Sequence, residues 1–211
     1  MTIVIIDYGA GNLRSVQKAF ELACKELKSK SSVIISNNPK DLKTASRIIL
    51  PGVGAFSDCK QGIMNIDGMI ENLEESIIIR KLPFLGICVG MHLLSSIGYE
   101  NGINEGFDWI KAEVVPFENI DMPIPHMGWN DLKIMSDHPV LTNINTGDHF
   151  YFVHSYFIKG CNNSNILATF DYGDSIPAII GAENIIGTQF HPEKSQKAGN
   201  QLIKNFISWN I

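Results

Sequence analysis

The stretch Thr2–Asp7, TIVIID, decides the fold class of this chain. It is an unbroken run of β-branched residues that ends at an acidic side chain and a glycine-rich turn. Such a run predicts a strand buried on both faces, as in a parallel sheet, because a half-exposed strand would alternate apolar and polar residues. The next segment, Leu13–Lys28, carries apolar residues at helical spacing. The chain is therefore expected to begin as strand, turn and helix.

The same order of elements recurs along the first half of the chain. The sequence predicts strands at Ser32–Ser36, Arg47–Leu50 and Pro83–Ile87, and a helix from about Ile66 to Arg80. Strands that alternate with helices indicate a parallel sheet with helices on both of its faces.

From Lys111 onward the predicted strands are shorter and are joined by Asn, Gly and Asp turns, which is typical of an antiparallel or mixed sheet. These strands are expected at Glu113–Phe117, His149–His154, Ile166–Phe170, Ala178–Ala182 and Ile185–Gln189. Helical spacing returns over Ser195–Trp209. Because no linker separates the two halves, we expect a single domain over residues 1–211. Its fold class is α/β, with three layers around a central mixed, mostly parallel sheet.

Composition and charge exclude several classes of function. The net charge is −5, and Lys and Arg are scattered, so no basic stripe is available to neutralise a nucleic-acid backbone. The apolar run at the N-terminus is too short for a membrane span or an export signal and has no basic flank. The four cysteines form no CxxC pair, as expected for reduced thiols in a cytoplasm.

The most informative local motif is Gly86-Ile87-Cys88-Val89-Gly90, which lies between a predicted strand and the helical run Met91–Ser95. Small residues around a nucleophile permit a tight strand-to-helix turn that exposes its side chain. A cysteine there sits at a helix N-terminus, whose free N–H groups and dipole favour the thiolate. Read alone, the pentapeptide fits a buried structural cysteine equally well.

A second motif, Phe190-His191-Pro192-Glu193, follows a predicted strand. A thiol nucleophile needs an imidazole to carry its proton and a carboxylate to orient that imidazole. On an extended segment, His191 and Glu193 would point to the same side, toward Cys88. Read alone, the motif fits a surface turn better.

The third motif is Pro51-Gly52-Val53-Gly54, again at the end of a predicted strand. Ligand sites in parallel sheets lie outside the carboxyl ends of the strands, which is where Cys88 is also expected. The two glycines leave the backbone free to turn the N–H of Val53 toward a developing oxyanion. Read alone, this motif is more often an ordinary loop.

In this order, the three motifs resemble class I glutamine amidotransferases, and the resemblance covers nearly the whole chain. Within that family, the chain most resembles the glutaminase subunits of imidazole glycerol phosphate synthases. The matching motifs are IDYGAGN (Ile6–Asn12), PGVGAF (Pro51–Phe56), PHMGWN (Pro125–Asn130), YFVHSY (Tyr151–Tyr156) and QFHPEKS (Gln189–Ser195). The resemblance implies that Cys88, His191 and Glu193 hydrolyse glutamine. It also implies that ammonia passes to a cyclase or synthase subunit with a TIM-barrel fold, in a heterodimer that serves histidine biosynthesis.

The resemblance also assigns further residues, without any cofactor or metal. The oxyanion hole would be formed by the backbone N–H groups of Val53 and Val89, the former after a change in its loop. Glutamine would be held by Gly52, Gly54, His92, Ser155 and Tyr156. The partner subunit would contact Met127, Trp129, Asn130, Tyr151 and Lys194. For Trp129 and Tyr151, core packing is the alternative.

His92 departs from the family pattern, because the elbow usually continues Cys-Leu-Gly-Met-Gln and the glutamine side chain helps to hold the substrate. An imidazole lacks the paired donor and acceptor of an amide. This leaves open a paralogous glutaminase that supplies ammonia to a nucleotide-activated sugar, and a binding-only subunit. A freestanding thiol hydrolase of small amides is a further alternative. Cys88 and His92, one helical turn apart, would also suit a metal site with His191 and Glu193.

Overall fold

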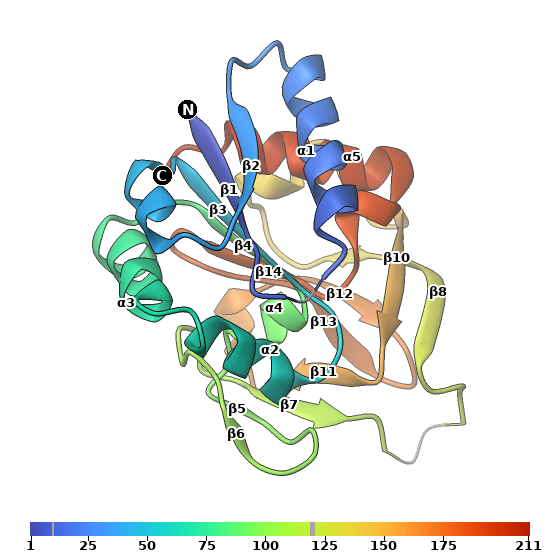
Figure 1. The fold of residues 1–211 in the computed structure, drawn as a ribbon. Helices are drawn as coiled ribbons and strands as arrows, with labels where there is room; N and C mark the ends of the chain where they lie inside the picture. Colours follow the sequence, from blue (N-terminus) through green and yellow to red (C-terminus); the bar gives the residue numbers. More distant parts are fainter. Residues whose placement is uncertain (10, 119–120) are drawn as a thin grey trace.

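The computed structural model of the chain describes residues 1–9, 11–118 and 121–211; Ala10, in the Ile6–Asn12 motif, lies outside them. An eight-stranded sheet in the order β2-β1-β3-β4-β14-β13-β12-β9 runs through the molecule (Figure 1). Its strands are β1 (Thr2–Ile6), β2 (Ser32–Ser36), β3 (Arg47–Gly52), β4 (Phe84–Cys88), β9 (Lys133–Ile134), β12 (Ile166–Asp171), β13 (Ser175–Ala182) and β14 (Ile185–Thr188).

The sheet is mixed, as the sequence predicts. Strands β2, β1, β3, β4 and β14 are parallel, whereas β13, β12 and β9 continue the sheet as antiparallel neighbours. Residues Ile3–Ile6 of β1 are all buried, which agrees with a strand covered on both faces. The early strands therefore form the parallel half, and most of the later strands form the antiparallel half.

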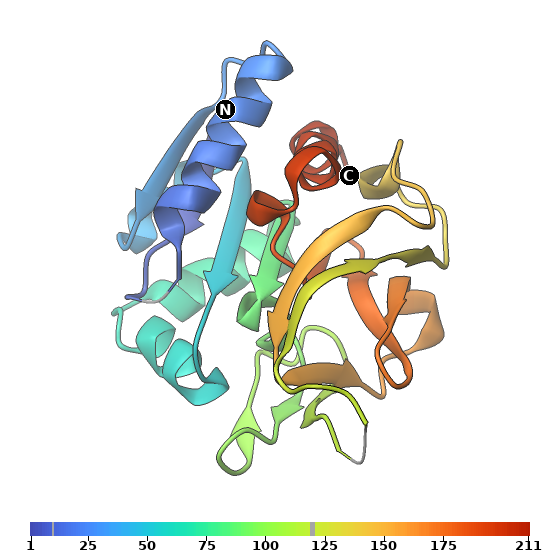
Figure 2. The same ribbon diagram turned by 90° about the vertical axis from the view of Figure 1, so that its right-hand side faces the viewer.

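Helices cover both faces of this sheet, which gives the three expected layers (Figures 1 and 2). Helices α1 (Leu13–Glu26) and α5 (Gln196–Ser208) pack together on one face, where the Phe20 and Phe206 rings meet edge to face at 6.3 Å. Helices α2 (Phe56–Met64), α3 (Met69–Glu74) and α4 (Val89–His92) lie on the other. Among the helices of the described residues, none combines the length and apolar character that crossing a membrane requires.

The prediction of a helix from about Ile66 to Arg80 is wrong about where the helix starts, and the last part of this segment is an irregular helix. Gly68 has φ of 76°, a left-handed conformation that interrupts the helix, so α3 begins at Met69. From Glu75 to Ile79 the chain continues as the π-helical segment η2. Helix α2 has no counterpart among the predicted elements.

Two smaller sheets carry most of the strands that the sequence does not predict. One pairs β10 (His149–His154) with β8 (His126–Asp131), and the other has the order β11-β7-β5-β6. The strands of the second sheet are β5 (Ile97–Gly98), β6 (Asn104–Glu105), β7 (Glu113–Pro116) and β11 (Tyr156–Lys159). Short 3-10 turns complete the chain: η1 (Pro39–Thr44), η3 (Pro139–Leu141), η4 (Asn163–Asn165) and η5 (Pro192–Lys194). Of these strands, β7 and β10 match predictions.

The strand register brings the three sequence motifs to one edge of the main sheet. Gly52 at the end of β3 lies opposite Cys88 at the end of β4. Thr188, the last residue of β14, lies opposite Ile87 on the other side of β4. Because these strands are parallel, the loops that follow them leave the sheet side by side.

Candidate active site

Cys88 occupies a strained turn between β4 and α4. Its backbone has φ of 55° and ψ of −112°, which is unusual for a residue with a side chain. A Cβ atom on Gly90 would lie 1.9 Å from the carbonyl oxygen of Leu50, and one on Gly86 would lie 2.4 Å from the carbonyl oxygen of Gly90. Only glycine fits either position, because the adjacent strand and the turn pack backbone to backbone. The predicted strand-to-helix elbow is therefore confirmed.

The His-Pro-Glu segment forms a 3-10 turn rather than the extended strand end that the sequence suggested. His191 precedes η5, and its Nδ1 lies 2.9 Å from Oε1 of Glu193. The backbone N–H of His191 donates to the carbonyl oxygen of Tyr151 at 2.9 Å. The hydroxyl of Ser195 donates to the carbonyl oxygen of His191 at 2.7 Å and accepts from the N–H of Tyr151 at 2.9 Å. The turn, tied to β10, brings imidazole and carboxylate together.

The environment of His191 favours a positive charge. Its side chain and that of Glu193 are only 4% and 1% exposed. Burial lowers the pKa of His191, but its interactions with Cys88 and Glu193 outweigh burial and raise the pKa to about 9. A protonated imidazole stabilises negative charge on the Cys88 sulfur. Nε2 of His191 is buried and has no hydrogen-bond partner among the described residues, so it is available for proton transfer.

A cavity of about 440 Å³ opens over Cys88 and His191. It gathers most of the residues that the sequence assigns to the oxyanion hole and to glutamine. Its lining is Val53, Gly54, Ala55, Cys88, Val89, His92, Glu100, Val153, His154, Ser155, Tyr156 and His191. Gly52 lies beneath this lining, where an added Cβ would come within 2.6 Å of the backbone nitrogen of Gly90.

His92 is buried in the wall of this cavity, 3% exposed. Its Nε2 lies 2.8 Å from Oε1 of Gln189. Burial lowers the pKa of His92 to about 4, so the ring is neutral at physiological pH. With the amide oxygen as acceptor, Nε2 carries the hydrogen and donates it. His92 is thus hydrogen-bonded to Gln189, two residues before His191.

The sequence did not identify two polar residues in the cavity wall, Glu100 and His154. Oε2 of Glu100 accepts a hydrogen bond from the backbone N–H of Phe56 at 2.7 Å, at the start of α2. Glu100 follows the short strand β5, and no local pattern marks it. His154 belongs to a recognised motif, but its burial and contacts depend on its pairing with β8.

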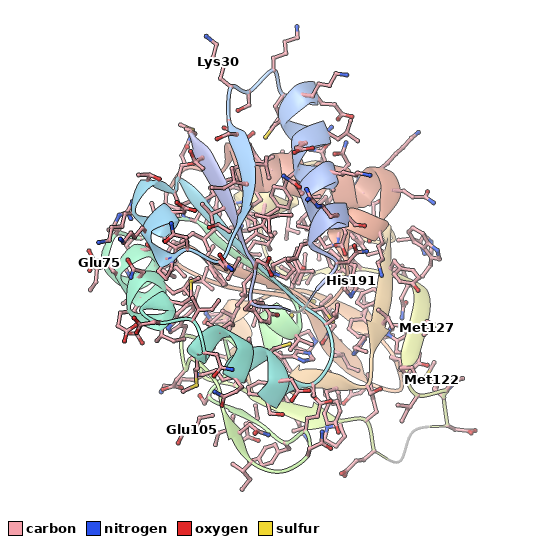
Figure 3. The ribbon with its side chains drawn as sticks, in the orientation of Figure 1. Lys30, Glu75, Glu105, Met122, Met127 and His191 are labelled. Carbon is pink, nitrogen blue, oxygen red and sulfur yellow. The ribbon has the colours of Figure 1, made fainter. Side chains whose placement is uncertain are left out.

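The residues expected to meet a partner lie mainly on one surface. Tyr151 pairs with Trp129 across β10 and β8, their rings are 6.0 Å apart, and Nζ of Lys194 lies 5.6 Å from the centre of the Tyr151 ring. Met127 and Trp129 are 63% and 48% exposed. Met127 projects from the outer side of the molecule, whereas His191 lies inside it (Figure 3). We call Met127, Trp129, Tyr151 and Lys194 the β8–β10 surface.

Asn130 differs from the other expected partner residues. Its side-chain amide donates to the carbonyl oxygen of Asp171 at 3.0 Å and also lies 3.4 Å from Nε2 of His126. It therefore connects β8 to the end of β12 and to the buried His126, and its predicted contact with a partner stays a prediction.

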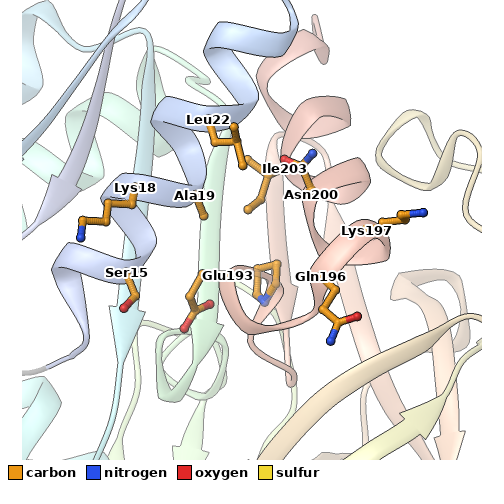
Figure 4. Close-up of a pocket in the computed structure, with 10 residues that line it drawn as sticks. Ser15, Lys18, Ala19, Leu22, Glu193, Gln196, Lys197, Asn200 and Ile203 are labelled. Atoms are coloured by element: carbon orange, nitrogen blue, oxygen red, sulfur yellow. The ribbon is translucent and has the colours of Figure 1, made fainter.

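A second cavity, of about 570 Å³, lies between α1 and α5 on the far side of the His-Pro-Glu turn (Figure 4). Lys18, Lys197 and Ile203 contribute to its lining, and Glu193 forms part of its wall. Cys88 and His191 do not line it; both line the cavity described above. Within residues 1–9, 11–118 and 121–211, no cluster of three or more His, Cys, Asp or Glu side chains is placed to hold a metal ion.

The buried histidines predict a stability maximum near pH 6.5. Burial lowers the pKa of His92 and His126 to about 4 and that of His154 to about 3. Below pH 6.5 the unfolded chain therefore binds more protons than the folded chain, and the free energy of unfolding decreases as the pH is lowered. His191, with a pKa of about 9, binds its proton more tightly when folded, so stability also falls as pH rises from 6.5 to 9, by up to about 3 kcal/mol.

Urea unfolding at pH 4.5, 6.5 and 9 measures both sides of this maximum. In the variant His191→Ala, the free energy of unfolding is expected to decrease much less between pH 6.5 and 9 than in the wild type. Its decrease below pH 6.5 should be unchanged. An alkaline decline that is unchanged in this variant would contradict the assignment to His191.

Comparisons with known proteins agree with this geometry. A profile of the family "Glutamine amidotransferase class-I" matches residues 4–209. "Imidazole glycerol phosphate synthase subunit HisH" of Cereibacter sphaeroides is 47% identical over 211 residues, and that of Rhodospirillum rubrum is 46% identical over 212 residues. In both comparisons, 99% of each chain is covered.

Among solved structures, the fold is similar to that of a glutamine amidotransferase with a TM-score of 0.70 at 18% identity, covering 97% of each chain. It is also similar to a glutamine amidotransferase of Thermotoga maritima, with a TM-score of 0.60 at 16% identity, covering 99% of this chain and 83% of the other. At these identities the structural likeness supports the fold alone. The family profile and the relatives decide membership: this chain belongs to the class-I glutamine amidotransferases.

Proposed function

We propose that this chain is the glutaminase subunit of an imidazole glycerol phosphate synthase and supplies ammonia to a cyclase subunit in histidine biosynthesis. The observation that carries the proposal is identity of 44 to 47% with relatives of that name over 99% of the chain. The cavity supports it, because it places a cysteine beside a histidine that is bonded to a buried glutamate. No feature of the site favours a nucleotide-activated sugar as the ammonia acceptor.

The triad would act by nucleophilic catalysis. The Cys88 thiolate adds to the side-chain carboxamide carbon of glutamine, and His191 gives its proton to the leaving nitrogen, which departs as ammonia. Glu193 holds the imidazole through Nδ1 and stabilises its positive charge. Water then adds to the glutamyl thioester with His191 as the base, which releases glutamate and restores the thiolate. A His191 pKa of about 9 suits the first proton transfer, because the proton is already present at neutral pH.

The oxyanion formed in each step would be stabilised by the backbone N–H groups of Val53 and Val89. Val89 is the first residue of α4, whereas Val53 is 41% exposed in the loop after β3. We propose that docking of the partner changes the conformation of this loop and so activates hydrolysis. Gly54, with φ of 93°, gives the loop the conformational freedom for such a change.

The remaining polar groups of the cavity suit an amino acid as substrate. Among its described lining residues, Glu100 has the single carboxylate, and we propose that it attracts the ammonium group of glutamine. His92, Ser155 and Tyr156 would provide hydrogen bonds, while Gly52 and Gly54 let the loop approach the substrate.

The β8–β10 surface is the proposed docking site for the cyclase subunit, to which we assign a TIM-barrel fold. Exposed Met and Trp side chains are the kind of anchor that interfaces use. We also propose that residues 1–211 form one domain and that the protein acts in the cytoplasm. All four cysteines are free thiols, which suits a reducing compartment.

Glutamate release from glutamine, measured for the chain alone and with increasing amounts of its cyclase subunit, tests this proposal. Addition of the partner is expected to raise kcat/KM about 5-fold to 150-fold, the usual range of coupling between two sites. Trp129→Ala should weaken this activation, whereas Tyr99→Ala, an exposed aromatic outside the β8–β10 surface, should not. Equal activity with and without the partner would contradict the coupling, and absence of glutamate in both conditions would contradict the glutaminase assignment.

A further inference from the structure

A chain of hydrogen bonds runs from the cavity wall to strand β8 and includes two buried histidines that the proposed mechanism does not use. Nδ1 of His154 lies 2.9 Å from the carbonyl oxygen of Tyr156. Nε2 of the same ring lies 2.9 Å from Nδ1 of His126, and Nε2 of His126 lies 3.4 Å from the side-chain nitrogen of Asn130. His126 and His154 are 4% and 6% exposed.

The direction of every bond in this chain is fixed by its ends. A carbonyl oxygen only accepts, so Nδ1 of His154 carries the hydrogen that it donates to Tyr156. Burial lowers the pKa of both rings far below 7, so each ring is neutral and carries one hydrogen. Nε2 of His154 therefore accepts from Nδ1 of His126, and Nε2 of His126 accepts from the amide of Asn130. Both imidazoles use both nitrogens.

The two ends of the chain lie in different functional regions. His154 and Tyr156 line the cavity above Cys88, with Ser155 between them. His126 and Asn130 belong to β8, the strand that also carries Met127 and Trp129 of the β8–β10 surface. His126 lies opposite His154 in the pairing of β8 with β10, so the bond between the two rings crosses directly from one strand to the other.

Aromatic packing leaves the His126 ring little freedom. It stacks on Phe152 at 5.0 Å and on Phe170 at 5.2 Å, and its centre lies 4.0 Å from that of Tyr172. A ring held on several sides cannot turn to find another partner. A shift of β8 therefore moves the Nδ1–H group of His126 that donates to His154, and so changes the position of the cavity wall.

We infer that His126 and His154 are positioning residues that fix the Ser155–Tyr156 wall of the glutamine pocket against strand β8, so that partner docking on β8 changes the affinity for glutamine. This inference rests on the proposed function, because it takes the cavity as the glutamine site and β8 as part of the docking site. Neither histidine contacts the reacting atoms in this scheme; each acts through the carbonyl of Tyr156.

Steady-state kinetics with the cyclase subunit present test the inference through the division between KM and kcat. His154→Ala leaves the Tyr156 carbonyl without its donor and is expected to raise the KM for glutamine about tenfold, with kcat within about threefold. His154→Asn should recover most of this loss, because its amide N–H lies near the position of Nδ1. His126→Ala should reduce the difference in KM between the isolated chain and the complex. His149→Asn, an exposed histidine on the same strand as His154, is the matched control and should behave as wild type.

Three outcomes would overturn the inference: an unchanged KM in His154→Ala, a fall in kcat alone, or equal KM values for His154→Asn and His154→Ala. If His154→Ala does not fold, the KM of His154→Asn and the partner response of His126→Ala decide the question in the same way. Hydrogen exchange of the backbone amides in residues 155–159 provides a readout that needs no activity. A wild-type complex that does not hydrolyse glutamine would count against the proposed function. Hydrogen exchange of residues 155–159 that is the same in the variants as in the wild type would count against the positioning role.

Discussion

Replacing Cys88 with alanine is expected to lower glutamine hydrolysis by at least about 10⁴-fold, because removal of a nucleophile eliminates the covalent route. Cys88→Ala should still fold, since the smaller side chain retains the Cβ atom of the elbow. Glutamate release in the presence of the cyclase subunit is the measurement. Cys161→Ala is the matched control, because Cys161 lies outside the cavity lining and is expected to keep wild-type activity.

Chemical labelling tests the same assignment without substitution. Burial raises the pKa of Cys161 to about 11 and also raises the pKa of Cys24 and Cys59, so these thiols stay protonated and react slowly at neutral pH. A limiting amount of iodoacetamide should therefore modify Cys88 first, in step with the loss of activity. Modification of another cysteine in step with that loss, or an active Cys88→Ala variant, would refute the role of Cys88.

Gly90→Ala is expected to destabilise the chain by at least about 3 kcal/mol or to prevent folding, because its Cβ would lie 1.9 Å from the backbone oxygen of Leu50. A backbone atom inside the main sheet cannot move aside as the end of a flexible side chain can. Relief of the clash would separate β3 from the elbow and displace Cys88 from the loop after β3. Urea unfolding and the yield of soluble protein measure the effect.

Gly102→Ala is the control for replacing a glycine by alanine at a position without close packing. Gly102 has a left-handed backbone, with φ of 116°, which Gly90 does not share, and an added Cβ there meets no atom within 4 Å. It should cost only about 1 kcal/mol of backbone strain. If Gly90→Ala and Gly102→Ala unfolded at the same urea concentration, close packing at the elbow would not be what requires glycine at position 90.

The parallel half of the sheet follows from the sequence because its signals are local. An apolar run such as Thr2–Asp7 has to be covered on both faces, and the helical spacing after it supplies a cover. The strands at Arg47–Leu50 and Pro83–Ile87 follow the same rule; the structure extends the first to Gly52 and shifts the second by one residue, to Phe84–Cys88. The Cys88 elbow follows as well, since its glycines permit a tight turn wherever it occurs.

The prediction fails where elements depend on distant partners. In strand β8 only His126 is buried, and the large apolar residues Met127 and Trp129 lie on the exposed side, so the alternation of polar and apolar residues does not mark a buried strand face. Its strand character comes from pairing with β10. The His-Pro-Glu segment was expected to be extended and is a 3-10 turn, held by bonds between His191, Ser195 and Tyr151 that no local pattern reveals.

By itself, the sequence determined the fold class and the order of the three motifs, and it predicted a nucleophile, its base and the carboxylate. These depend on residue types at short spacing, which fix backbone propensity and chemistry locally. Only the tertiary structure decided that His92 is bonded to Gln189, 97 positions away, that Glu100 joins the cavity, and that His126 meets His154. The physical reason is that burial and hydrogen-bond partners arise from contacts between distant segments, and these contacts set the charge and orientation of each polar group.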